Sequence, residues 1–131
     1  MNVRCPVIET GVLMVEKILK VKEMNDSVGG IVTCVIKNPP VGLGEPCFDK
    51  LEALLGMAML SLPATKGFEF GSGFEGTKLL GSQHNDKFDL KEDAKDYEEI
   101  TKLSETPLLE QSSNHGGGTL GGISTGSDII F

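Results

Sequence analysis

The chain ends an amphipathic helix and at once enters a glycine-rich run, which reads SLPATKGFEFGSGF over residues 61–74. Glycine within an extended segment loses backbone entropy and packs no side chain, so it usually marks a bend, a bulge or a close approach of other atoms. Gly67, Gly71 and Gly73 therefore predict a kinked strand that lies under another element. Another part of the chain, or a ligand, has to come against this backbone.

The helix before this run is the most regular element that the sequence predicts. Pro46 suits the first helical position, and the acidic Glu45 and Asp49 favour the positive end of the helix dipole. An apolar stripe at helical spacing follows, formed by Phe48, Leu51, Leu54, Leu55, Ala58, Met59 and Leu62. Gly56 inside the stripe costs about 1 kcal/mol relative to alanine, which predicts close packing against another helix.

Three further elements follow from local patterns. Residues 10–24 have apolar positions at helical spacing, with Thr10 suited to be the N-cap and Asn25 and Asp26 suited to be the exit. Residues 31–36 are rich in β-branched side chains and predict a strand, which Pro39 must follow because proline supplies no amide donor. The apolar end of the chain, residues 129–131, predicts another strand.

Length and charge limit the classes of function. The 131 residues suit one domain, and the net charge of −7 argues against a broad surface for nucleic acid or anionic membrane. No apolar run approaches the ~18 residues of a membrane span. An anionic small molecule stays compatible, because backbone dipoles can bind it. The cysteines, Cys5, Cys34 and Cys47, lie far apart and favour a reducing, intracellular compartment.

Most of the negative charge lies in one segment. Residues 86–110 contain nine acidic residues and four lysines. A segment of this composition is more typical of a mobile surface insertion than of an active face. We therefore expect an acidic surface insertion at about residues 86–110 within a single domain.

Several patterns suggest chemistry, and each has a structural alternative. Gly71–Gly76 spells G-x-G-x-x-G, but no long amphipathic helix follows, so a dinucleotide site is not expected. His84 and His115 lack the spacing of metal ligands and a serine or cysteine elbow, which favours hydrogen-bonded structural roles. Cys47 is expected in the first turn of a helix, where packing is a more common role than a reactive thiolate.

The glycines of residues 116–118 and 121–122 allow two interpretations. Five glycines in seven positions describe a tight backbone without Cβ atoms, placed beside something planar or anionic. The same composition also describes a plain flexible loop. Composition alone does not separate the two.

Longer motifs resemble a known family. The segments GLGEPCFDKLEA, SLPATKGFEFGSGF, GSQHND and NHGGGTLGGISTG together resemble the central segment of chorismate synthase, almost from end to end. The resemblance implies an α+β fold that forms part of a β-α-β sandwich, with helices held between antiparallel sheets. It also implies a homotetramer for the parent enzyme, located in the cytoplasm, or in a plastid if a transit peptide lies upstream.

The resemblance also implies an activity. Members of the family convert 5-enolpyruvylshikimate 3-phosphate into chorismate and phosphate by a 1,4-elimination in the shikimate pathway, with reduced FMN as cofactor. By the same resemblance, Pro63 and Ala64 after the helix, and Gly121 in the LGGIS run, contact FMN. The chain would then leave the helix at Leu62 so that the Pro63–Ala64 backbone meets the cofactor.

Other family motifs have no counterpart in this sequence. They include G-E-S-H-G, R-P-G-H-A-D, R-x-S-S, K-P-T and G-R-H-D-P, and neither His84 nor His115 matches a catalytic histidine of the family. In the NHGGG loop, Gly116 and Thr119 replace the more usual alanine and isoleucine or valine. We therefore expect a fragment without catalytic residues of its own. The alternative is a non-catalytic remnant that binds flavin or associates with full-length subunits.

Overall fold

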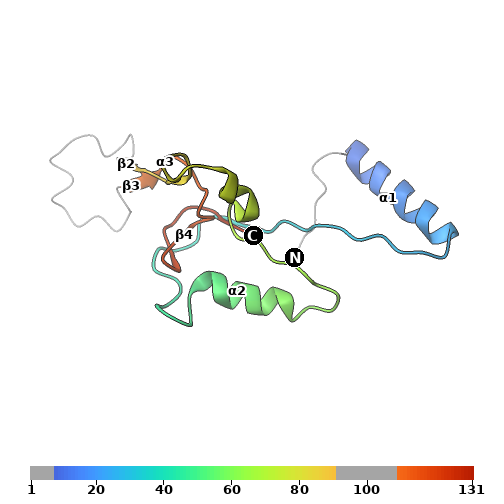
Figure 1. Ribbon diagram of the computed structural model, residues 1–131, viewed down its shortest axis with the longest axis horizontal. Coiled ribbons are helices and arrows are strands. Elements are labelled where there is room, and N and C mark those ends of the chain that lie inside the picture. Colours follow the sequence, from blue (N-terminus) through green and yellow to red (C-terminus); the bar gives the residue numbers. More distant parts are fainter. Residues whose placement is uncertain (1–7, 91–108) are drawn as a thin grey trace. The chain divides into compact units, whose positions relative to one another are not determined.

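The computed structural model describes residues 8–90 and 109–131 and divides the chain into two compact units, Met1–Val32 and Thr33–Phe131. Its elements are α1 (Ile8–Glu23), β1 (Val35–Ile36), α2 (Leu51–Leu60), the 3-10 helix η1 (Gly73–Lys78), α3 (Gly81–His84), β2 (Phe88–Leu90), β3 (Leu109–Gln111), β4 (Thr119–Leu120), β5 (Ile123–Ser124) and β6 (Ile129–Ile130) (Figure 1). Helices and small antiparallel sheets confirm the predicted α+β class. In the described parts of the chain, no helix has the length and apolar character needed to cross a membrane.

The first unit contains α1, which confirms the helix predicted over residues 10–24. Its end is formed as predicted, because Asn25 is left-handed at φ 54 and its amide donates to the Lys22 carbonyl oxygen at 3.0 Å. The predicted N-cap is wrong. The helix begins at Ile8, so Thr10 lies inside it.

In the second unit, β1 and β6 pair antiparallel, with Ile36 opposite Ile129. Two hydrogen bonds between Cys34 and Phe131, of 2.7 and 3.1 Å, continue the pairing beyond the strands. Ile129 is only 1% exposed and is the buried large apolar side chain of this unit among the described residues. The strand predicted over residues 31–36 is shorter than expected, because the short β6 leaves most of that run without a partner.

The helix α2 is confirmed, but it begins later than predicted. Cys47 has φ 65, a left-handed conformation that an α-helix excludes, and the amide of Glu45 donates to the Asp49 carbonyl oxygen at 2.9 Å. A turn thus occupies the positions where the first helical turn was expected, and Pro46 is not the first helical residue. Cys47 is an exposed thiol in a loop, so its predicted place in the helix is wrong.

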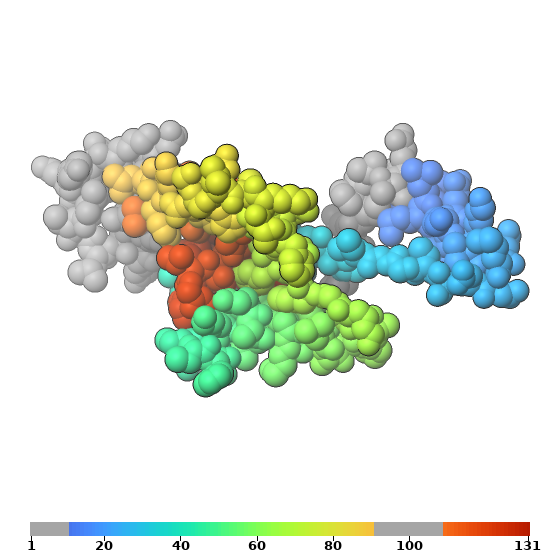
Figure 2. Space-filling view, in the orientation of Figure 1, coloured from blue at the N-terminus to red at the C-terminus, as the bar shows by residue number. Residues whose placement is uncertain are grey.

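Gly56 is the buried residue of α2, and its neighbour is an aromatic ring. A Cβ at Gly56 would lie 3.4 Å from the ring of Phe68. Phe68, Phe70 and Phe131 form a cluster whose ring centroids lie 6.3, 5.8 and 6.4 Å apart. Close packing at Gly56 is therefore confirmed, but the predicted partner, another helix, is wrong. Figure 2 shows the C-terminal segment, in red, between α2 in green and the segment of η1 in yellow.

The glycine-rich segment is not the kinked strand that the sequence predicts. Gly71 and Gly73 adopt φ 58 and φ 50, so the extended run breaks and the chain turns into η1. The predicted close approach is confirmed at Gly71, since a Cβ there would lie 2.6 Å from the amide nitrogen of Gly117. The G-x-G-x-x-G letters lead into a 3-10 helix and not into the long α-helix of a dinucleotide site.

The two ends of the predicted acidic insertion pair with each other. β2 and β3 run antiparallel, with Phe88 opposite Gln111 and Leu90 opposite Leu109. The rest of that prediction, residues 91–108, lies outside the described residues.

The Gly71 contact leads to a test of stability. Replacing Gly71 with alanine forces a left-handed alanine, at about 1–2 kcal/mol, and adds a methyl group against backbone atoms, at about 1–3 kcal/mol. We expect Gly71→Ala to lower the free energy of unfolding by about 2–5 kcal/mol, measured by urea denaturation.

Gly67→Ala is the matched control, because a Cβ at Gly67 meets no atom within 4 Å. We expect it to change the stability by no more than about 1 kcal/mol. Equal effects of the two substitutions would contradict the close contact at Gly71.

Candidate functional site

The second glycine run packs directly on the first. The amide of Ser72 donates to the His115 carbonyl oxygen at 2.8 Å, which places the NHGGG loop, residues 114–118, against the glycine-rich segment. Gly117 and Gly118 are buried and left-handed, at φ 67 and φ 86. Among the glycines of this run and the next, Gly121 has open space around it, whereas the tight backbone without Cβ atoms is confirmed at Gly117 and Gly118. The ligand beside it stays a prediction.

The Asp86 carboxylate accepts hydrogen bonds that hold this loop. Its Oδ1 accepts hydrogen bonds from the Ser113 hydroxyl at 2.7 Å and from the His115 amide at 2.8 Å. Its Oδ2 accepts a hydrogen bond from the Gly116 amide at 2.6 Å. In the sequence, Asp86 is the last residue of the GSQHND motif and one of nine acidic residues in the segment 86–110, and neither pattern predicts this role. The three donors lie 27, 29 and 30 positions later in the chain, and no local pattern predicts such contacts.

The contacts of Asp86 set its protonation state. Burial alone would raise the pKa of this carboxyl, because it removes water from the charged form. The hydrogen bonds from Gly116, Ser113 and His115, together with the charge of the His115 side chain, outweigh burial and hold the pKa below its ordinary value. The carboxylate therefore stabilises the fold at neutral pH, and this stabilisation is lost as the pH falls through the lowered pKa.

The two histidines lie together beside this anchor. Their rings stack with centroids 5.3 Å apart, and His84 Nε2 lies 2.7 Å from the Ser72 hydroxyl oxygen. The predicted hydrogen-bonded role is confirmed for His84. A serine, histidine and aspartate triad does not form from these side chains, because the Asp86 carboxylate accepts its hydrogen bonds from residues 113–116.

Metal ligands do not gather in the described part of the chain. No group of three or more histidine, cysteine, aspartate or glutamate side chains is placed there to hold an ion. In the same residues, Cys34 is a half-buried free thiol and Cys47 an exposed one. Cys5 lies outside the described residues.

The residues predicted to contact FMN, Pro63, Ala64 and Gly121, are all exposed. Ala64 has φ 66, a left-handed conformation that costs alanine of order 1–3 kcal/mol and that clusters at ligand sites. Gly121 has φ 61, and a Cβ there would meet no atom within 4 Å. An exposed, left-handed backbone at Ala64 and Gly121 fits a flat cofactor held by main-chain groups. The contact with FMN itself stays a prediction.

The helix α2 separates these predicted contacts. Gly121 and Gly122 form the two-residue turn between β4 and β5, and both have positive φ, as in a type I′ turn. The Gly122 carbonyl oxygen accepts a hydrogen bond of 2.8 Å from the amide of Leu51, where α2 begins, whereas Pro63 and Ala64 follow its end (Figure 1). A helix of this length spans ~15 Å. The structure therefore does not bring Gly121 next to Ala64.

Comparison with known proteins supports the resemblance. A family model described as chorismate synthase matches residues 1–131. The chorismate synthase of Saccharomyces cerevisiae is 50% identical over 129 residues, which cover 98% of this chain and 31% of the yeast protein. The chorismate synthase of Synechocystis sp. is 54% identical over 129 residues, which cover 98% of this chain and 32% of that protein.

A solved structure agrees with the sequence matches. A crystal structure of chorismate synthase superposes on this chain with a TM-score of 0.78 at 31% identity, covering 95% of this chain and 34% of that one. The chain thus spans about a third of the length of the relatives that it matches. Because the family model matches every residue and half of the positions are identical in these relatives, the chain belongs to the chorismate synthase family.

Proposed function

We propose that this chain is the flavin-contacting segment of a chorismate synthase. The reaction is the conversion of 5-enolpyruvylshikimate 3-phosphate into chorismate and phosphate by 1,4-elimination, with reduced FMN. The observation that carries the proposal is the match of the whole chain to this family at about half identity. Because the chain spans a third of its relatives, we assign the complete reaction to a longer polypeptide that contains this segment. We extend the proposal to a cytoplasmic homotetramer of that polypeptide, as the family resemblance implies.

The role of this segment is to bind and orient the cofactor. Reduced FMN, when bound, lends electron density to the C–O bond that breaks and then takes it back. The exposed backbone at Ala64 and at Gly121 would meet the cofactor, since neither position carries a side chain larger than a methyl group. The Gly121 amide lies in a hairpin turn outside the β4–β5 pairing, so it is free of the strand ladder. Catalytic roles are assigned to neither His84 nor His115.

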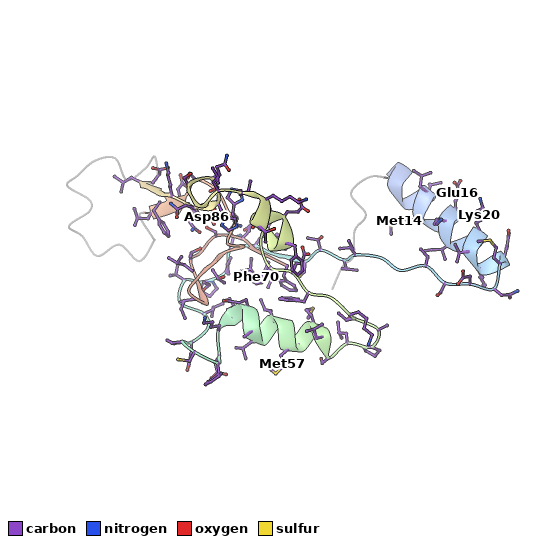
Figure 3. All side chains as sticks on the ribbon, in the orientation of Figure 1. Met14, Glu16, Lys20, Met57, Phe70 and Asp86 are labelled. Atoms are coloured by element: carbon purple, nitrogen blue, oxygen red, sulfur yellow. The ribbon has the colours of Figure 1, made fainter. Side chains whose placement is uncertain are left out.

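A second function is favoured by the apolar surface of the described residues. Among the large apolar side chains in these residues, Val21 and Ile129 are buried, whereas Met57 and Leu60 on α2 are 68% and 51% exposed. Figure 3 shows Met57 directed away from the strands of its unit. Such a surface fits a non-catalytic remnant that associates with chorismate synthase subunits. Co-purification with a complete chorismate synthase would support this function, and a chain that stays monomeric beside that enzyme would contradict it.

A segment exchange tests the proposed function. In the Saccharomyces cerevisiae enzyme, the matching 129 residues are replaced by this chain, with which they share 50% identity. We expect the exchanged enzyme to release phosphate from the substrate with reduced FMN, because the segment supplies the same backbone contacts. We expect the isolated chain to release none, because it lacks the histidine motifs of the family. Steady turnover by the isolated chain, or an exchanged enzyme that folds without activity, would contradict the proposal.

A pair of glycine substitutions tests the cofactor contact. Gly121 and Gly42 are both exposed and left-handed, with φ 61 and φ 93, and a Cβ at either meets no atom within 4 Å. Alanine at either position should therefore cost a similar ~1–2 kcal/mol of stability. We expect Gly121→Ala alone to raise the KM of the exchanged enzyme for reduced FMN, by about tenfold or more. A similar KM in the two variants would remove Gly121 from the cofactor site.

A further inference from the structure

Asp86 is placed to control the shape of a loop that it does not belong to. Its carboxylate is half-buried and accepts three hydrogen bonds, all from residues 113–116. Figure 3 labels Asp86 on the segment between α3 and β2. The charge of His115 favours the carboxylate, and His84 stacks on His115. Asp86 thus joins the end of α3 to the NHGGG loop.

The backbone from this loop leads without interruption to the turn at Gly121. The Gly117 carbonyl oxygen accepts a hydrogen bond from the amide of Ile130 at 3.3 Å, and the Gly118 carbonyl oxygen accepts one from the amide of Thr125 at 2.9 Å. The next residues are β4, which pairs with β5 across the turn. If the loop shifts at Gly116, either these two hydrogen bonds break or the β4–β5 hairpin, which carries the turn, moves with the loop.

We propose that Asp86 is a positioning residue for the cofactor site: its carboxylate fixes residues 113–116 and thereby sets the orientation of the turn at Gly121. The identity of the cofactor rests on the proposed function, whereas the fixing of the loop does not. Asp86 itself does not touch the cofactor in this scheme.

The geometry explains why aspartate is required. A carboxylate has two acceptor oxygens, and both oxygens of Asp86 accept hydrogen bonds here. An asparagine of the same shape has one acceptor oxygen. If that oxygen keeps the bonds from Ser113 and His115, its NH₂ group faces the Gly116 amide, donor against donor. The loss should therefore be largest at Gly116.

The first measurement uses the full chain and its amide protons. We expect Asp86→Asn to increase the hydrogen exchange rate of the Gly116 amide by about 10- to 100-fold, with a smaller increase at His115. In the wild type, the chemical shifts of both amides should titrate together, with a midpoint below the ordinary carboxyl pKa, and Asp86→Asn should abolish this titration. The control is Asp89→Asn, which removes the same charge from an exposed position on β2. Exchange rates equal to those of this control would overturn the proposal.

The second measurement uses the exchanged enzyme described above. We expect Asp86→Asn to raise the KM for reduced FMN about tenfold while kcat falls less, and we expect Asp89→Asn to leave both unchanged. An unchanged KM together with a loosened Gly116 amide would overturn the link from the loop to the cofactor. If the wild-type exchanged enzyme is itself inactive, the proposed function fails, and the amide measurement still decides whether Asp86 fixes the loop.

Discussion

The backbones of Gly71 and Gly117 touch with no side chain between them, and the rest of the second unit depends on this contact. A Cβ on Gly117 would lie 2.6 Å from the Cα atom and the amide nitrogen of Gly71. Ile130 joins both glycines, since its carbonyl oxygen accepts from the Gly71 amide at 2.9 Å and its amide donates to Gly117. The strand that pairs with β1 and the loop that leads to Gly121 are thus held at one point. A methyl group on either glycine would separate them.

Main-chain dipoles contribute more than charged side chains to the electrostatic stabilisation in the candidate site. The chain carries a net charge of −7, yet the Asp86 carboxylate is stabilised by two amides and a hydroxyl. Hydrogen bonds of this kind favour the charged form as a nearby cation would. The same reasoning extends to the proposed cofactor, which would meet the backbone at Ala64 and Gly121. An acidic chain can therefore contain a site for an anionic cofactor without a cluster of lysine or arginine.

Local sequence patterns predicted the features that depend on residues close together in the chain. The body of α2, the exit of α1 at Asn25, the strand at Ile129 and the close packing at Gly56 all follow from local patterns, and the structure confirms them. The predictions were wrong where residues far apart in the sequence contact each other in the fold. Gly56 packs on Phe68 and not on a helix, and a hydrogen bond of 2.8 Å from Leu51 to the Gly122 carbonyl oxygen marks where α2 begins. Propensity favoured an earlier start, but the turn before the helix overrides it.

In the candidate site, too, local sequence patterns and contacts between distant residues determine different features. Glycine content allowed two interpretations of residues 116–118, and the contacts that the fold makes at Gly117 and Gly118 show the tight one. Asp86 was missed, because its importance lies in donors that the fold brings to it. A site of this kind is specified by the positions that lack a Cβ and by one carboxylate that holds them together. In this proposal, side chains around the site can change without altering the backbone assigned to the cofactor, whereas a substitution at Gly117 or Asp86 would alter the loop that leads to that backbone.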